Sequence, residues 1–349
     1  MRMGEFMLKV GVIGCGRIAQ TRHLPEYAAR KDVEVVGVFD QNSTRAEEVA
    51  KQFGAQAYSS AEEFIADKQI DAVSICTANE THAELAIASL RAGKHVLCEK
   101  PMGTTLEECE AMAAAARETG NQLMVDQNQR IAAAHSRARQ LIAEGHIGKP
   151  LSFSTTFAHG GPETWSVTPG TTSWFFDKKR ASLGAMADLG VHKTDLIQYL
   201  LGSTVVEVSA KIATLDKRTP DGELVSVDDN ALCIYRMSDG VIGTMRASWT
   251  NYGPEDNSTI IYGDAGVMHL YDDPVHSIVI DLRDGTRELY DLDVIQTNDN
   301  QTSSGIIDAF VEGITDGIGP LISAESVLPA MRAVFAAVES DHLGKAIQL

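Results

Sequence analysis

The sequence predicts an α/β protein with two domains: an N-terminal doubly wound Rossmann domain and a C-terminal α/β domain with a large, mostly antiparallel open sheet. The chain has 349 residues, which is long enough for two domains. In its first third, short apolar runs alternate with helix-like segments, as is typical of a buried parallel sheet. Beyond residue 127, strand-like runs recur with turn residues between them, which favours antiparallel pairing.

The first domain is predicted over residues 1–127. Its strands are short, apolar and rich in β-branched residues. They are Leu8–Ile13, Val33–Phe39, Ala72–Cys76 and His95–Cys98, with Gln122–Val125 as a further candidate. The helices expected between them are Ser43–Phe53, Ser60–Asp67, Thr81–Ala92 and Thr104–Glu118. Ser60 with Glu63, and Thr104 with Glu107, match the capping box that opens helices.

The second domain is predicted over residues 128–349. A helix is expected over Ile131–Glu144, a strand over Leu151–Phe157 and a second helix over Ala185–Leu201. Further strands are expected at Val205–Ile212, Asn230–Met237, Val241–Thr250, Ser258–Tyr262, Val267–Tyr271 and Ser277–Leu282. Asp239-Gly240 and Asp284-Gly285 are hairpin turn signals, and two helices, Ser304–Gly313 and Ser323–His342, are expected to close the chain.

Composition narrows the class of protein. The formal net charge is −18, which argues against a broad nucleic-acid-binding face, although backbone amides at a helix N-terminus can still bind a dinucleotide. The five cysteines form no Cys-x-x-Cys pair, and we expect them to be reduced. No apolar stretch is long enough to span a membrane, and Met1–Met7 lacks the apolar core of a signal peptide. We therefore expect a cytoplasmic protein with no membrane or nucleic-acid partner.

A glycine fingerprint follows the first predicted strand. Gly14-x-Gly16-x-x-Ala19, with Arg17 and Ile18 between, opens a helix. In such a loop the first glycine permits the tight turn, the second admits the pyrophosphate, and the small third residue lets the helix pack on the strand. The alternative is a strand–turn–helix unit that binds no nucleotide.

Asp40 ends the second predicted strand, about 20 residues after the fingerprint, where a ribose-binding carboxylate is expected. A carboxylate accepts hydrogen bonds from ribose hydroxyls and repels a 2′-phosphate, so we favour NAD over NADP. Arg45 lies five residues further on and is the residue that would meet a 2′-phosphate. Its alternative role is that of a solvated residue in the first turn of a helix.

Further cofactor contacts are expected from loops that follow other strands, because such loops line the ligand crevice of a doubly wound sheet. Asn79 is equally well explained as a helix cap, and His82 as a packing residue in the first helical turn. The candidates are Thr77, Asn79, His82, Glu99 and Gln127.

Two polar groups are candidates for the chemistry. Lys100, in Glu99-Lys100-Pro101, follows an apolar strand and can hydrogen-bond a substrate oxygen. The alternative is an ordinary solvated lysine whose stem packs on apolar surface. Asp188 and His192 lie four residues apart, on one face of a predicted helix. A carboxylate beside an imidazole raises its basicity, which suits removal of a hydroxyl proton. The alternatives are a surface pair or a metal site, although no third ligand stands out.

Taken together, these motifs resemble the Gfo/Idh/MocA oxidoreductase family, which includes inositol and sugar dehydrogenases. The resemblance covers nearly the whole chain. It rests on the Gly14–Ala19 loop, Asn79, His82, Glu99-Lys100-Pro101, Trp174-Phe175-Phe176-Asp177, Asp188 and His192. One departure is Ala181-Ser182-Leu183-Gly184, where members often have consecutive glycines, and another is Lys193 directly after His192.

The resemblance implies an NAD-dependent hydride transfer between the nicotinamide and a secondary hydroxyl of a sugar, inositol or related polyol. Lys100 and His192 would flank that hydroxyl, with Asp188 supporting them, and either Lys100 or His192 would transfer the proton. A homodimer or homotetramer through the C-terminal sheet is also implied. Candidate substrate contacts are Arg130, His159, Trp165 and Trp174 beside the catalytic residues, with Gln127 and Lys193 as further pocket candidates.

Two other functions are compatible with the fold. One is reduction of a non-sugar carbonyl or imine, or oxidation of a dihydrodiol; a tyrosine tends to replace the histidine in the dihydrodiol branch, so His192 argues against that reaction. The other is a non-catalytic NAD(P)-sensing regulator, which loss of the lysine or the histidine would favour. Both residues are present.

Overall fold

The computed structural model describes residues 7–167, 170–295 and 303–349. The chain forms two compact units. The first comprises residues up to Asp126 and a returning segment that ends at Leu328. The second begins at Gln127 and resumes at Pro329. The boundary expected after residue 127 lies next to this point, while the returning segment lies within the range predicted for the second domain.

The returning segment joins the first unit through its backbone. The N–H of Val125 donates to the carbonyl oxygen of Ile322 at 3.1 Å, and Met124 forms an antiparallel bridge with Ser323. The segment therefore bonds to the edge strand β6. Hydrophobic periodicity identifies helices, but it does not say which sheet a late segment will join.

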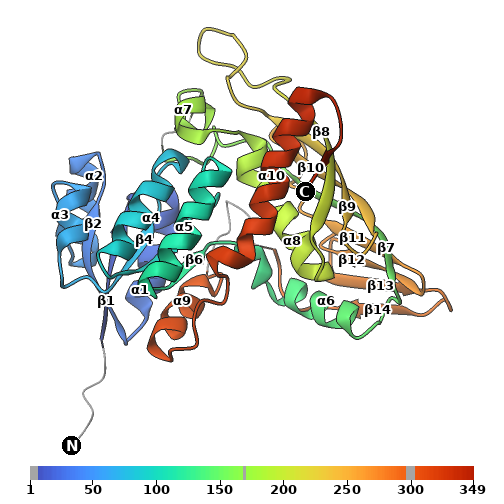
Figure 1. Ribbon diagram of the computed structural model, residues 1–349, viewed down its shortest axis with the longest axis horizontal. Helices are drawn as coiled ribbons and strands as arrows, with labels where there is room; N and C mark the ends of the chain where they lie inside the picture. The colour runs from blue at the N-terminus through green and yellow to red at the C-terminus, as the bar shows by residue number, and fades with distance from the viewer. Residues whose placement is uncertain (1–6, 168–169, 296–302) are drawn as a thin grey trace, which may run out of the picture. The chain divides into compact units, whose positions relative to one another are not determined.

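The first unit is built on a six-stranded sheet with the order β3-β2-β1-β4-β5-β6 (Figure 1). All of its described pairings are parallel. Since β4 returns to the other side of β1, the loops after these two strands meet at the point where the strand order reverses, which is where such sheets bind ligands. The strands are β1 (Leu8–Ile13), β2 (Val33–Phe39), β3 (Gln56–Ala57), β4 (Ala72–Ile75), β5 (His95–Cys98) and β6 (Leu123–Val125).

The helices of the first unit begin close to the predicted residues. The exception is the capping box of α5, which uses Thr105 and Glu108 in place of the predicted Thr104 and Glu107. The helices are η1 (Ala19–His23), α1 (Leu24–Ala29), α2 (Ser43–Phe53), α3 (Ala61–Ala66), η2 (Asn79–Thr81), α4 (His82–Arg91), α5 (Leu106–Thr119), α9 (Ile306–Thr315) and the start of α10 (Ala324–Leu343).

The second unit carries a nine-stranded sheet with the order β14-β13-β12-β11-β7-β10-β9-β8-β15. Strands β7 and β10 pair in parallel, and the other described pairings are antiparallel. The predicted open, mostly antiparallel sheet is therefore confirmed. Its strands are β7 (Pro150–Ala158), β8 (Val205–Ala213), β9 (Asn230–Met237), β10 (Ile242–Ser248), β11 (Thr259–Gly263), β12 (Gly266–Leu270), β13 (Ile278–Leu282), β14 (Arg287–Tyr290) and β15 (Ile347–Gln348).

One face of this sheet is covered and the other is exposed. On β9, Ala231, Cys233 and Tyr235 are buried, whereas the alternate residues Leu232 and Ile234 are 54% and 60% exposed. Helix α8 packs on β7, and α6 packs on β12. The helices of this unit are η3 (Asn128–Arg130), α6 (Ala133–Ala143), η4 (Trp174–Phe176), α7 (Lys178–Ala181), η5 (Met186–Gly190), α8 (Val191–Leu201) and the end of α10.

All five cysteines are free and buried: Cys15, Cys76, Cys98, Cys109 and Cys233. Burial is the main cause that raises the pKa of the Cys15, Cys109 and Cys233 thiols to about 12. In the part of the chain that the structure describes, no helix is both long and apolar enough to cross a membrane.

Candidate active-site residues

The fingerprint loop has the geometry that its glycines require. Gly14 has a φ of +92°, and a Cβ there would lie 2.5 Å from the carbonyl oxygen of Cys76 and 2.8 Å from the nitrogen of Thr77. Gly16 leaves open space, since an added Cβ would meet nothing closer than that same oxygen at 4.0 Å. The loops after β1 and β4 thus touch, and the exposed Arg17 and half-buried Ile18 begin the helix beyond them.

Asp40 is held at the end of β2 beside this loop. One carboxylate oxygen accepts the N–H of Cys15 at 2.8 Å, and the other accepts the N–H of Asn42 at 2.8 Å. Arg45 Nη1 lies 3.5 Å from both oxygens, so Arg45 pairs with Asp40. The carboxylate is therefore fixed next to the backbone of the fingerprint loop, which fits the ribose-binding role expected for it.

The loop after β4 holds Thr77, Asn79 and His82. His82 is fully buried, and its ring nitrogens lie 2.8 Å from the carbonyl oxygen of Pro101 and 3.2 Å from that of Thr77. Burial is the main cause that lowers the pKa of His82. This geometry favours its packing role, because the ring links two backbone segments. Asn79 is buried and begins η2, while Thr81 is the N-cap of α4, so Asn79 is not the cap of that helix.

Glu99 lies in a buried polar cluster directly before the half-buried Lys100. His23 Nε2 lies 3.0 Å from Glu99 Oε1, and the other ring nitrogen lies 3.1 Å from the hydroxyl of Ser74. Burial tends to raise the pKa of Glu99, but the hydrogen bond and charge of His23 outweigh it and hold that pKa well below its usual range. His23 was not predicted, because it lies 76 residues from Glu99 in the sequence.

Asp126 completes this cluster. Its Oδ2 lies 3.7 Å from His23 Nε2, and burial, followed by the charge of Glu99, raises the pKa of Asp126 to about 7. Among the described residues, His23, Glu99 and Asp126 are also the group whose atoms could surround a metal ion. The hydrogen bonds of His23 to Glu99 and Ser74 account for the arrangement without one.

In the second unit, Asp188 and His159 come together around Trp249. Because Ala158 pairs with Ser248 at the parallel ends of β7 and β10, the next residues, His159 and Trp249, follow at the same edge of the sheet. The indole Nε1 of Trp249 donates to Asp188 Oδ2 at 3.0 Å, and His159 Nε2 lies 4.0 Å from the same oxygen. Trp249 was not among the predicted site residues, because it lies inside the predicted strand Val241–Thr250, whereas the observed strand β10 ends one residue before it.

The helix that carries Asp188 and His192 is not regular. Asp188 lies in the π-helical turn η5, and His192 lies in the first turn of α8. Such wide turns are frequent at functional sites. Both side chains are 7% exposed, so they are not the surface pair that was the alternative. The ring of Phe157 lies 5.8 Å from that of His159 and 6.1 Å from that of His192.

Asp228 fixes the start of η5. Its carboxylate accepts the N–H groups of Gly184 and Met186, each at 2.7 Å. Burial is the main cause that raises the pKa of Asp228 to about 6. A Cβ at Gly184 would lie 1.9 Å from the carbonyl oxygen of Asp228, so a glycine is required here. Asp228 was also missed, since nothing in its neighbourhood marks it as a helix anchor.

Two predicted substrate contacts have structural partners. Arg130 forms a two-point ion pair with the buried Asp195, at 2.7 Å and 2.5 Å. Lys193 is fully buried and donates to the carbonyl oxygen of Asn257 at 2.9 Å. Both residues therefore anchor α8 and its surroundings, which is a structural role in place of the predicted substrate contact.

Of the other candidates, Trp165 and Gln127 have polar atoms available for a ligand, whereas Trp174 packs on a neighbouring ring. Trp174 stacks on Phe175 with ring centroids 4.0 Å apart, and Trp165 meets the same phenyl ring edge-on at 5.1 Å. The indole Nε1 of Trp165 is buried without a hydrogen-bond partner in the described segments. The same holds, among the residues described, for both polar atoms of the Gln127 side chain. Buried polar atoms of this kind are expected where a ligand binds.

Family models match both parts of the chain. The model described as "Oxidoreductase family, NAD-binding Rossmann fold" matches residues 8–127, and the "GFO/IDH/MocA C-terminal domain" matches residues 135–269. The chain belongs to the Gfo/Idh/MocA oxidoreductase family. The oxidoreductase class and the NAD-binding fold expected from the sequence are thereby confirmed.

Individual members of the Gfo/Idh/MocA family are similar over most of their length. Levoglucosan dehydrogenase of Pseudarthrobacter phenanthrenivorans is 32% identical over 294 residues, or 74% of this chain and 72% of that protein. Myo-inositol 2-dehydrogenase of Thermotoga maritima is 27% identical over 350 residues and 98% of each chain. A solved structure of levoglucosan dehydrogenase with NADH and levoglucosan has a TM-score of 0.84 and 27% identity, covering 98% of this chain and 99% of that one.

Proposed function

We propose that this protein is an NAD-dependent dehydrogenase that transfers a hydride between a secondary hydroxyl of a sugar, inositol or related polyol and the nicotinamide. The observation that carries the proposal is the buried Asp188 carboxylate, bonded by Trp249 and faced by His159, in a chain of this family. Relatives named for the oxidation of levoglucosan, myo-inositol and D-glucosides support the substrate class.

The residues of the first unit fit the dinucleotide. Gly14 and Gly16 form a loop without side chains at a helix N-terminus, as pyrophosphate binding requires. The Asp40 carboxylate is held in place by the backbone and can accept hydrogen bonds from the ribose hydroxyls. Its charge favours NAD over NADP. Thr77 and Asn79 lie in the loop after β4. Gln127, the first residue of the second unit, has carboxamide atoms available for the cofactor. When bound, the cofactor supplies the acceptor or donor of the hydride.

Side chains of the protein transfer the proton of the substrate hydroxyl. In oxidation, His192 takes the hydroxyl proton while the carbinol carbon gives up its hydride, so a C–H and an O–H bond break and a carbonyl forms. Lys100 donates a hydrogen bond to the oxygen as negative charge develops on it. Asp188 orients these groups. These roles follow from the resemblance to the family, and the reverse sequence reduces the carbonyl.

Polyol binding is assigned to His159, Trp165 and Trp174. Indole rings pack against the apolar faces of a sugar ring, while imidazole and indole N–H groups bond its hydroxyls. The buried Nε1 of Trp165 is such a donor. We further propose a cytoplasmic homodimer or homotetramer that buries the exposed face of the second unit's sheet, because Leu232, Ile234 and Ile242 are each more than half exposed there.

A substrate panel tests this function. Purified protein is mixed with NAD or NADP and with inositols, hexoses, anhydrosugars and glycosides, and formation of reduced cofactor is followed by absorbance. We expect turnover with at least one polyol and a higher kcat/KM for NAD than for NADP. Tight NADH binding without turnover of any polyol or carbonyl would contradict the proposal and support a sensing regulator.

A further inference from the structure

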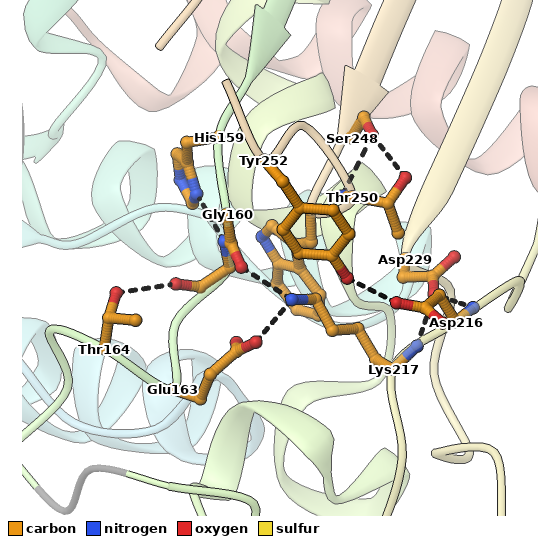
Figure 2. A network of polar contacts seen from close by, with 12 residues as sticks. His159, Gly160, Glu163, Thr164, Asp216, Lys217, Asp229, Ser248, Thr250 and Tyr252 are labelled. Carbon is orange, nitrogen blue, oxygen red and sulfur yellow. Dashed lines mark hydrogen bonds and ion pairs between the residues drawn. The ribbon is translucent and has the colours of Figure 1, made fainter. Parts of the chain in front are cut away.

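The loop that follows β7 is tied to a distant part of the second unit by one buried lysine. This loop carries His159 and Trp165, both proposed substrate contacts. Lys217 reaches it from the chain that follows β8, as Figure 2 shows. Its Nζ donates to the carbonyl oxygen of Gly160 at 2.6 Å and also bonds Glu163. We call Lys217 and Glu163 the loop clip.

The clip is shielded from water. The side chain of Lys217 is 5% exposed and that of Glu163 is 24% exposed. The Lys217 ammonium also lies 4.8 Å from the centre of the Tyr252 ring. Taking both charges out of water is costly, and apolar residues of similar size often stabilise a fold as well as a buried ion pair does. Added stability is therefore not a sufficient explanation for this largely buried pair, and the geometry it imposes on the loop is the alternative.

The lysine end of the clip is itself fixed. The carboxylate of Asp229 accepts the backbone N–H of Leu215 at 2.8 Å, of Asp216 at 2.7 Å and of Lys217 at 2.9 Å. Asp229 precedes β9, so the backbone of Lys217 is attached to the sheet (Figure 2). The ammonium is thus presented to the loop from a backbone that three hydrogen bonds hold in place.

The loop end of the clip sets the orientation of His159. Between Gly160 and Glu163, the N–H of Gly161 donates to His159 Nδ1 at 2.9 Å. In the neutral ring the proton is then on Nε2, which lies 4.0 Å from Asp188 Oδ2. Gly161 has a φ of +99°, and a Cβ there would lie 2.4 Å from Glu163 Oε2 and 3.0 Å from Lys217 Nζ. The two clip residues therefore contact Gly161, whose N–H bonds the His159 ring.

We propose that Lys217 and Glu163 are positioning residues that hold the loop so that His159 presents its Nε2–H for polyol recognition beside Asp188. This inference deepens the proposed function and rests on it. The hydrogen bond from Trp249 to Asp188 involves neither clip residue, so we expect it to persist when the clip is lost. Loss of the clip therefore weakens substrate binding more than it slows the chemical step.

Two variants and a matched control test the clip. Lys217→Met removes the cation, and Glu163→Gln removes the charge while Lys217 keeps its bond to Gly160. Lys211→Met replaces a lysine of the same unit whose side chain is 74% exposed. We expect KM for the best polyol to rise about tenfold in the clip variants, with kcat within about threefold and the NADH Kd unchanged. Lys211→Met should match the wild type.

A double-mutant cycle tests whether the clip acts through His159. In a His159→Ala background, Lys217→Met should change KM by less than about twofold, because the group it positions is gone. A full tenfold effect in both backgrounds would overturn that route. Unchanged KM in both clip variants would overturn the positioning role.

Hydrogen exchange provides a readout that needs no substrate. Backbone amides over residues 159–166 should exchange at least about tenfold faster in Lys217→Met than in wild type or Lys211→Met. Unchanged exchange would overturn the clip itself. Absence of turnover in the wild type would overturn the proposed function and the substrate-positioning role with it. Faster exchange confined to the clip variants would in that case still support the clip as the element that orders this loop.

Discussion

Lys100 and His192 are proposed to act on the substrate hydroxyl and not to bind the cofactor. Replacing either one should therefore lower the rate without changing the affinity for NADH. Lys100→Ala and His192→Ala are each expected to lower kcat by at least about 100-fold, because general acid–base groups contribute on that scale. The NADH Kd, measured by fluorescence, should stay within about threefold. Lys211→Ala is a matched control on an exposed lysine. An undiminished kcat in either variant would remove that residue from the mechanism.

Gly14 lies in the proposed cofactor loop, where an added methyl group would not fit. Gly14→Ala would place a Cβ 2.5 Å from the carbonyl oxygen of Cys76, at a φ of +92°. We expect the NADH Kd to rise at least about tenfold, since strain of about 2 kcal/mol at this position must shift the loop.

Gly54→Ala is the control for this prediction. Gly54 also has a positive φ, +69°, but a Cβ there meets nothing within 4 Å. It should lower stability by about 1 kcal/mol, measured by denaturant unfolding, and leave NADH binding unchanged. Equal loss of NADH binding in both variants would show that backbone strain alone, and not the contact with the β4 loop, is responsible.

At the scale of elements, the buried cluster beneath the Lys100 turn gives a pH-dependent contribution to stability. Burial and the charge of Glu99 raise the pKa of Asp126 to about 7, while His23 and Arg22 oppose them. The folded state then binds a proton that the unfolded state releases near pH 4. This contribution to stability is present at low pH and is lost as the pH rises through about 7.

Asp126→Asn, which is neutral at every pH, isolates this contribution. The unfolding free energy of Asp126→Asn relative to wild type should increase by at least about 1 kcal/mol between pH 5.5 and pH 8. Denaturant unfolding at a series of pH values measures it, with Asp308→Asn, a largely exposed carboxylate of the same unit, as control. A pH-independent difference would contradict the raised pKa of Asp126.

Elements with one strong local signal were predictable from the sequence. Strands β1, β2, β5 and β9 begin and end at the predicted residues because continuous or alternating apolar runs mark them. The α5 cap was displaced by one residue because Thr104/Glu107 and Thr105/Glu108 offer the same spacing. The two-residue strands β3 and β15 are too short to produce a periodic pattern.

Side-chain contacts across the chain were less predictable than the motifs. Gly14, Asp40, Asp188 and His192 follow from spacing, and they are buried or fixed in the structure. The partners of Asp188 and Glu99 could not be predicted, because Trp249 and His23 reach them only through the fold. Ser182, in the stretch that departs from the family pattern, has a φ of +66°, a backbone conformation that favours glycine.

At the scale of the whole molecule, the exposed sheet face predicts self-association. Leu232 and Ile234 on β9 and Ile242 on β10 lie on one face beside Arg236. Contiguous exposed apolar side chains of this kind mark interaction sites. We expect Leu232→Asp and Ile234→Asp to shift the sedimentation mass toward that of one 37.6 kDa chain.

Ile318→Asp is the control, because Ile318 is 77% exposed but belongs to the first unit. It should leave the assembly unchanged. A wild-type protein that sediments as a monomer at micromolar concentration would contradict the interface. Loss of association in Ile318→Asp alone would instead indicate an interface on the first unit.

The burial of all five thiols makes this chain suited to site-specific labelling. Because the thiolate is the reactive form, cysteines with raised pKa values that lie away from water react slowly with maleimides. A cysteine introduced at Ile318 or at Val275, which is 73% exposed in the second unit, would be modified selectively in the otherwise native sequence. A fluorophore pair at these two positions would report by energy transfer whether NADH or a polyol changes the distance between the units.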